Sequence, residues 1–171
     1  SDCKALAEMA DILGRDDEKD ELLERAEIFS SNMNKLWNDE IGIFLNYRTD
    51  LDAFSERLSP TIFYPLLAEI APKQKSVRIL DYFYDTSKFY GKWMLPSTSR
   101  DDPSFKKQRY WKGAIWPPLN FLTYLSLRMA RHYGASTELS EKSLHLFLEE
   151  WFRKGFVSEN YSSISGTGDA S

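Results

Sequence analysis

The sequence predicts an all-α fold in which helices follow one another in antiparallel pairs. In six segments, apolar residues recur every three or four positions, as they do on one face of a helix. No segment has the pattern of a buried parallel sheet. The pairs differ in length and share no fixed-period signature, which disfavours a repeat solenoid. We therefore expect three helical hairpins in a layered or toroidal arrangement.

The first pair is predicted over residues 3–36. Gly14 ends its first helix, because glycine readily takes the left-handed conformation that closes a helix. Asp16 and Asp17 begin the second helix, where their carboxylates interact favourably with the helix dipole. The residues expected to form the buried faces are Cys3, Leu6, Met9, Ala10 and Leu13 in the first helix and Leu22, Ala26, Phe29, Met33 and Leu36 in the second.

A short extended or β-like segment near residues 41–48 separates the first pair from the second. It includes Gly42, which marks a turn, and the residues after it are mostly β-branched, aromatic or aliphatic. Ser59 and Pro60 then predict a helix start, and Pro72 ends this helix and opens the next. The next helix is expected to bury a stripe that consists of Val77, Leu80, Phe83 and Tyr84.

A long loop is predicted near residues 87–110. It contains Gly91, Pro96 and Pro103 and shows no helical periodicity. A loop of this length is uncommon in a compact domain and often carries function.

The third pair follows this loop. Pro117 and Pro118 suit the first turn of a helix, which we expect to reach Gly134. The last helix is predicted over residues 137–154, with Gly155 closing it.

The composition argues against several kinds of partner. The 171 residues carry a net charge of −4 from interspersed acidic and basic side chains, so no nucleic-acid surface is expected. The longest apolar run, residues 62–71, is interrupted by Pro65 and Glu69 and is too short to span a membrane. Residues 1–14 show no secretory signal. We expect one soluble domain over residues 1–171.

Metal and cofactor chemistry are not expected. Cys3 is the only cysteine, so the chain has no internal disulfide and no paired-cysteine metal site. His132 and His145 are the only histidines and belong to different predicted elements. We therefore expect ordinary surface or core histidines and no metal ligands.

Two segments mix aromatic and polar residues in a way that suggests a sugar site. Residues 109–120 read RYWKGAIWPPLN, and residues 159–161 read ENY at the start of a polar, glycine-containing tail. Carbohydrate sites combine aromatic rings, which stack on sugar C–H faces, with polar groups that bind hydroxyls. The aromatic residues are equally consistent with a core, and a loop glutamate is usually only solvated. Lys112 and Gly113 are less typical of a core.

Four motifs occur in this order along the chain: LSPTIFYPLLAEIAP, LPSTSRDDPSF, YWKGAIWPPLNFLTYLSL and ENYSSISGTG. Their residues and order resemble the catalytic (α/α)6-barrel domain of glycoside hydrolase family 63, of the mannosylglycerate hydrolase and glucosidase type. The resemblance covers almost the whole chain. It implies that residues 1–171 are the C-terminal half of such a domain, a partial (α/α)6 toroid without the N-terminal half and the last helix.

The resemblance implies a segment of an inverting glycosidase that hydrolyses α-glucosidic or α-mannosidic bonds, with a carbohydrate substrate. Glu159 matches the family's general base. The residues implied as substrate-binding are Tyr110, Trp111, Lys112, Gly113, Trp116, Asn160 and Tyr161. Lys112 departs from the family, which more often has arginine there, and Ser162 stands where asparagine is expected. Because an ammonium cannot make the two-pronged contact of a guanidinium, we expect Lys112 to hold different hydroxyls.

An inverting hydrolase also needs a protonated acid about 6.5–9.5 Å from the base. The resemblance implies that this acid lies upstream of Ser1, in the missing half of the barrel expected in the parent chain, so residues 1–171 alone are expected to be inactive. The other carboxylates considered as substitutes are Asp50, Asp52, Glu56, Asp101 and Asp102. None matches the family's acid by motif, and turn or surface positions are expected for all five.

Two alternative functions stay open at this point. One is a non-catalytic carbohydrate-binding module on the same scaffold. The other is a helical-hairpin module that recognises proteins through an exposed apolar groove.

Overall fold

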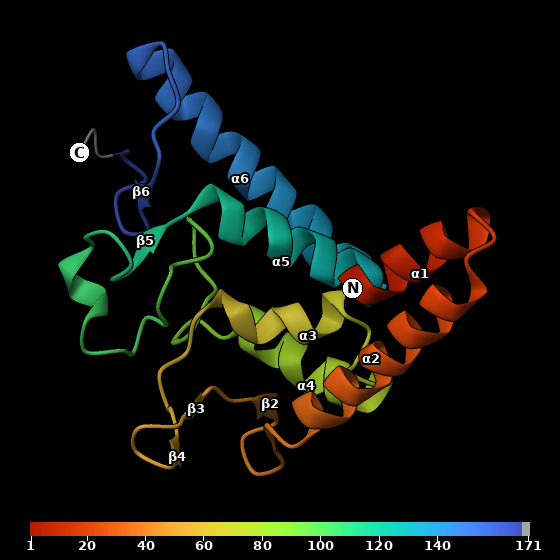
Figure 1. Cartoon of the computed structure of the whole chain (residues 1–171). Helices are drawn as coiled ribbons and strands as arrows, with labels where there is room; N and C mark the ends of the chain where they lie inside the picture. Colours follow the sequence, from red (N-terminus) through yellow and green to blue (C-terminus); the bar gives the residue numbers. More distant parts are fainter. Residues whose placement is uncertain (169–171) are drawn as a thin grey trace.

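The computed structural model describes residues 1–168 and shows three successive helical pairs (Figure 1). The six α-helices of this part of the chain are α1 (Asp2–Ile12), α2 (Asp16–Asn34), α3 (Tyr64–Leu67), α4 (Lys73–Tyr84), α5 (Pro117–Met129) and α6 (Tyr133–Lys154). α1 packs against α2, α5 packs against α6, and α3 packs against α5. The predicted first and third hairpins are confirmed, but in the predicted second pair α3 packs against α5 in place of α4.

The first helix of the second pair is shorter and less regular than predicted. A 3₁₀ turn, η1 (Pro60–Phe63), leads into the single turn of α3. Pro65 lacks an amide hydrogen, and its ring clashes with the carbonyl four residues before it in a continuous helix. The chain leaves helical geometry at Glu69, which has a left-handed φ of 57°. A regular helix up to Pro72 was therefore a wrong prediction.

The connection between α5 and α6 also differs from the prediction. α5 ends at Met129, and the chain reverses at Arg131, whose φ is 61°. The His132 amide donates to the Leu127 carbonyl over 2.8 Å and closes the reversal. α6 already begins at Tyr133, so Gly134 lies inside a helix and ends none.

The region around residues 41–48 forms two small hairpins in place of one extended segment. β1 (Trp37–Asn38) pairs with β2 (Ile43–Phe44), and β3 (Tyr47–Arg48) pairs with β4 (Ala53–Phe54), both antiparallel. Gly42 lies in the turn between β1 and β2 with φ 77°.

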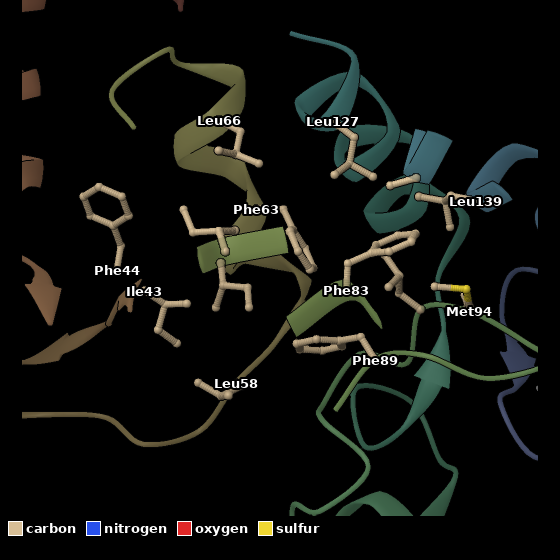
Figure 2. Packing of buried hydrophobic residues seen from close by; sticks show 14 of the residues in the cluster. Ile43, Phe44, Leu58, Phe63, Leu66, Phe83, Phe89, Met94, Leu127 and Leu139 are labelled. Atoms are coloured by element: carbon tan, nitrogen blue, oxygen red, sulfur yellow. The ribbon is translucent and has the colours of Figure 1, made fainter. Parts of the chain in front are cut away.

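The main core lies between the second and third helical pairs (Figure 2). The Phe63 ring meets Phe83 of α4 and Phe89 of the long loop edge-on, with centroids 6.1 and 5.7 Å away. Other buried members of the core are Ile43, Phe44, Leu58, Leu66, Ile79, Met94, Leu95, Leu127 and Leu139. The long loop is therefore anchored in the core.

The first pair is much less buried than predicted. Ala7 and Ala10 of α1 are buried, but α2 has no buried residue. Leu6, Met9 and Leu13, all expected in the buried face, are 50 to 68% exposed, and Phe29 of α2 is 60% exposed. Of the face predicted for α1 only Ala10 is buried, together with Ala7 outside the predicted set, because little of the described chain covers the rest of that face.

The connections divide between the two ends of the molecule (Figure 1). Tight reversals join the helices within each pair, on the right in the view. The three long connections, residues 35–59, 85–116 and 155–168, lie at the opposite end. Both motif segments belong to this second end.

Candidate functional site

Two short strands bring the predicted site segments together. β5 (Ala114–Ile115) pairs antiparallel with β6 (Tyr161–Ser162), with Ala114 opposite Ser162 and Ile115 opposite Tyr161. Figure 1 shows this pair next to the start of α5. The RYWKGAIW and ENY segments, far apart in the sequence, are therefore joined by backbone hydrogen bonds.

The two faces of this strand pair have different surroundings. Ile115 and Tyr161 share one face because they lie directly opposite each other, and both are fully buried. They form a small cluster with Trp93 and Leu146. Ala114 and Ser162, the other opposed pair, lie on the other face.

An aromatic stack leads from the interior to the surface. The Trp111 and Trp116 rings are stacked, with centroids 4.0 Å apart and planes 14° apart. Tyr110 meets Trp116 edge-on at 5.0 Å, and the Trp116 indole N–H donates to the Tyr110 carbonyl over 3.0 Å. Trp116 is 5% exposed, but Trp111 is 46% and Tyr110 59% exposed. The outer rings therefore offer apolar surface to a ligand.

The backbone turn that presents these rings requires Gly113. Arg109 and Lys112 exchange two backbone hydrogen bonds of 3.2 and 3.1 Å, which close a tight turn. Gly113 then has φ 91°, and a Cβ atom there would lie 2.4 Å from the Phe105 carbonyl oxygen. Only glycine fits such a position without displacing the backbone.

Besides Arg109, the exposed charged groups of the two segments are Glu159 and Lys112. Within residues 1–168, neither side chain takes part in a hydrogen bond or an ion pair. Each is therefore available to water or to a ligand. Together with Tyr110 and Trp111 they are the predicted site residues that reach solvent.

The remaining predicted site residues are buried, and Tyr161 corrects the sequence prediction. Tyr161 has no exposed surface, its ring packs against Phe147 at 5.5 Å, and its hydroxyl accepts a hydrogen bond from the Ser158 amide over 3.0 Å. Burial raises the pKa of its hydroxyl. A ring without accessible surface cannot contact a sugar. Asn160, 4% exposed, and Gly113 are also buried.

Gln108 is a structural residue of the site that sequence reasoning missed. Its side-chain oxygen accepts from the Ser163 amide over 2.9 Å and from the Ser162 hydroxyl, and its amide nitrogen donates to the Phe105 carbonyl over 2.9 Å. The Ser163 hydroxyl donates in turn to the Gly113 carbonyl over 2.7 Å. Gln108 thus links the aromatic loop to the tail. A polar residue in a polar loop gives no such signal in the sequence.

Arg100 and Asn120 hold the long loop, and sequence reasoning missed them too. The Arg100 guanidinium donates to the carbonyls of Tyr90 and Trp93 over 2.8 and 2.7 Å, and burial lowers its pKa. The Asn120 side chain accepts from the Leu95 amide over 3.0 Å and donates to the Met94 carbonyl over 2.7 Å. These bonds replace the hydrogen bonds of regular secondary structure in this loop.

The carboxylates considered as substitute acids have other partners or lie exposed. Asp50 pairs with Arg48, Asp52 accepts from the Tyr47 hydroxyl, and Glu56 is exposed.

Asp101 and Asp102, in the long loop, are held as carboxylates. Asp101 pairs with Lys88. Asp102 lies in a turn, as predicted, but is buried there, and it accepts from the Ser104 amide and hydroxyl over 2.7 and 2.6 Å. Burial alone would raise the pKa of both groups, but these contacts outweigh it and the net pKa of each is lowered. A general acid needs the opposite shift.

The histidines have ordinary surroundings. His132 hydrogen-bonds to the Ser76 hydroxyl over 2.5 Å, and burial lowers its pKa. His145 pairs with Glu149 over 2.9 Å and stacks on Trp93. Within residues 1–168, no group of three or more His, Cys, Asp or Glu side chains is arranged to hold a metal ion.

Two further observations concern the molecule as a whole. Among the helices of the described part, none combines the length and apolar character needed to cross a bilayer.

A pocket of about 360 Å³, lined in part by Leu36, Phe44 and Tyr64, lies away from the strand pair and includes none of the predicted site residues.

Curated relatives resemble the chain over most of its length. The mannosylglycerate hydrolase of Thermus thermophilus is 27% identical over 153 residues, which cover 88% of this chain and 34% of the relative. The mannosylglycerate hydrolase of Rubrobacter radiotolerans is 26% identical, covering 90% and 36%. The mannosyl-oligosaccharide glucosidase of Saccharomyces cerevisiae is 29% identical, covering 61% and 14%. The chain thus spans about a third or less of the length of these relatives.

Solved structures share the fold. A GH63 mannosylglycerate hydrolase from Thermus thermophilus, in complex with glucose, matches 97% of this chain and 38% of its own, with a TM-score of 0.81 and 21% identity. A neutral trehalase from Saccharomyces cerevisiae matches 85% of this chain and 27% of its own, with a TM-score of 0.74 and 22% identity. These matches confirm the predicted class, a mostly helical fold of the (α/α)6 type.

A family description also fits the entire sequence, from residue 1 to residue 171, and not only the motifs quoted above. The predicted resemblance to glycoside hydrolase family 63 is thereby confirmed. The chain belongs to the family of mannosylglycerate hydrolase MGH1-like glycoside hydrolase domains.

Proposed function

We propose that the protein containing this chain is an inverting glycoside hydrolase that cleaves α-glucosidic or α-mannosidic bonds, with Glu159 as its general base. The observation that carries the proposal is the pairing of β5 with β6, which joins the aromatic segment to the ENY segment. An exposed carboxylate with no partner within residues 1–168 suits a base that must accept a proton from water.

The proposed sugar site uses the exposed half of the aromatic stack. Trp111 and Tyr110 offer ring surface to the C–H face of a sugar, and Trp116 supports them from below. Lys112 donates to sugar hydroxyls as a single charged point, where an arginine would make a two-pronged contact. Gly113, Asn160 and Tyr161 act indirectly, by fixing the backbone that carries the exposed groups.

The proposed mechanism needs a second carboxyl group outside this chain. Inversion requires a protonated acid on the far side of the scissile bond, about 6.5–9.5 Å from the base, which leaves room for one water molecule. No carboxylate described above suits this role. We propose that residues 1–171 form one domain that is part of a larger barrel, lacking its N-terminal half and its last helix, and that another segment supplies the acid. The exposed apolar side chains of α1 and α2 support this view, because an adjoining segment would cover them.

The test uses the full parent protein with a panel of α-glucosides and α-mannosides, and proton NMR identifies the first anomer released. We expect hydrolysis with the β-anomer appearing first. The Glu159→Gln variant should lose about a hundred- to ten-thousand-fold in kcat, the usual contribution of a general base. The Glu141→Gln variant, altered at an exposed position of α6, serves as control.

Three results would count against the proposal. Full activity of the Glu159→Gln variant rules out the assignment of the base, and release of the α-anomer first rules out inversion. Binding of the sugars without turnover by the parent protein would favour the carbohydrate-binding module instead.

A further inference from the structure

The segment that carries Glu159 is a loop whose two ends meet at one carboxylate of α6. The Ser158 hydroxyl and the Gly168 amide both donate to Glu150 Oε1, each over 3.2 Å. Glu150 lies in the last turns of α6, and Tyr161 forms an isolated backbone bridge with Gly168. Glu159 directly follows one of these two anchored ends.

Glu150 is a buried carboxylate whose two oxygens each bind a basic side chain. It is 2% exposed, and Lys154 contacts Oε1 over 2.7 Å while Arg153 donates to Oε2 over 3.1 Å from Nε. Burial alone would raise the pKa of Glu150, but the hydrogen bonds from Lys154 and Arg153 outweigh it and the net pKa is lowered. Lys154 also donates to the Gly168 carbonyl over 2.6 Å. A buried charge is costly unless it is paired, and Glu150 is paired on both of its oxygens.

The loop of residues 158–168 packs closely against α6 and Trp93, so it cannot shift without losing these contacts. A Cβ atom on Gly168 would lie 2.0 Å from the Ser158 hydroxyl oxygen and 2.8 Å from Glu150 Oε1. A Cβ atom on Gly166 would lie 2.5 Å from the Trp93 ring. Two glycines therefore allow the loop to lie directly against α6 and Trp93.

We propose that Glu150 is a positioning residue for Glu159. By binding Ser158 and Gly168 at once, it closes the loop and fixes the backbone from which the Glu159 carboxylate projects. This inference rests on the proposed function of Glu159 as general base. The buried charge of Glu150 then serves to place the Glu159 carboxylate. A residue that only stabilised α6 would not need to contact either end of the loop.

The first measurement is independent of catalysis. In the full parent protein, the Glu150→Ala and Ser158→Ala variants should speed amide hydrogen exchange across residues 159–167. The Glu149→Ala variant, altered at the adjacent residue, whose exposed side chain pairs with His145, should leave this exchange unchanged. Exchange in residues 159–167 that stays at the wild-type rate in both test variants would overturn the anchoring role.

The second measurement is a double-mutant cycle. The substrate is an α-glycosyl fluoride, whose leaving group needs little acid assistance, so that low rates are measurable by fluoride release. Glu150→Ala should lower kcat by about a hundred-fold, the scale expected from a misplacement near 1 Å, with little change in KM. In the Glu159→Gln background, the same change should lower kcat by less than about twofold, because residues that act as a unit are not additive.

The outcomes separate this proposal from the one before it. An equal loss of kcat in both backgrounds, with Glu159→Gln itself impaired, overturns only the positioning role. Full activity of Glu159→Gln alone overturns the base assignment and the positioning role with it, without involving Glu150. If Glu150→Ala does not fold, Ser158→Ala, which leaves the Glu150 ion pairs in place, provides the same comparison.

Discussion

Trp111 stacks on Trp116 with ring centroids 4.0 Å apart, and the first ring is half exposed while the second is buried. One aromatic pair thus has an outer member available to a ligand and an inner member that belongs to the fold. Substituting each in turn separates the two roles.

Trp111→Ala should raise KM about tenfold in the parent enzyme, equivalent to roughly 1.4 kcal/mol of binding free energy, with little change in Tm. Trp116→Ala should also lower the free energy of unfolding by about 3–5 kcal/mol, because it removes a buried indole. Steady-state kinetics and thermal unfolding of both variants check this. An unchanged KM for Trp111→Ala would exclude that ring from the sugar site.

Gly113→Ala should destabilise the protein and abolish activity. The left-handed φ of 91° and the Phe105 carbonyl oxygen, 2.4 Å from the position of a Cβ, both oppose any side chain. Gly134→Ala is the matched control, since nothing lies within 4 Å of its Cβ position and the residue is helical. The control should gain about 0.4–1 kcal/mol in unfolding free energy. Urea unfolding of the two variants should therefore shift in opposite directions.

Gln108→Ala should lower the unfolding free energy by about 1–3 kcal/mol, because it leaves the Ser163 amide without its partner. It should also lower kcat, since the tail that carries Glu159 loses its link to the aromatic loop. Gln74→Ala, on an exposed position of α4, is the control and should change neither quantity. Denaturant unfolding and kinetics on the same samples give both values.

The stability of the parent protein should depend on pH through Glu150. The pKa of Glu150 in the folded protein lies below its ordinary value of 4.5, so the unfolded state takes up the proton first as the pH falls. The stabilisation is complete above pH 4.5 and is lost as the pH falls through the folded pKa. Wild type and Glu150→Gln, compared by urea unfolding between neutral and acidic pH, should differ most above pH 4.5 and converge below it. A difference that grows with acidity contradicts the ionised state of Glu150.

The helices follow from the sequence because their spacing is a local property. Their boundaries depend on longer-range effects, as Pro65 and Arg131 illustrate. At Pro65 the chain adopts a 3₁₀ turn and one α turn, and at Arg131 a non-glycine residue makes the reversal. In α1 most of the predicted buried face is exposed, because periodicity does not say what covers a face.

The sequence predicts the candidate site only as far as its two motif segments. The RYWKGAIW and ENY segments were identified, and β5 and β6 bring them together. The burial of Tyr161 and the contacts of Gln108 and Glu150 were not foreseen, because they depend on the packing of segments far apart in the sequence. A buried glutamate looks the same in a sequence as a solvated one until its partners are known.

The long connections and the short helix reversals lie at opposite ends of the molecule, which matters for changing substrate specificity. Residues 35–59 and 85–116 emerge at the end that holds Glu159, whereas the short reversals at Gly14 and Arg131 lie at the opposite pole. Segments exchanged with another family member at the first pole would alter the groups around the proposed sugar site while leaving the helix reversals intact. Substrate range in such a scaffold can therefore diverge without redesign of the helices beneath it.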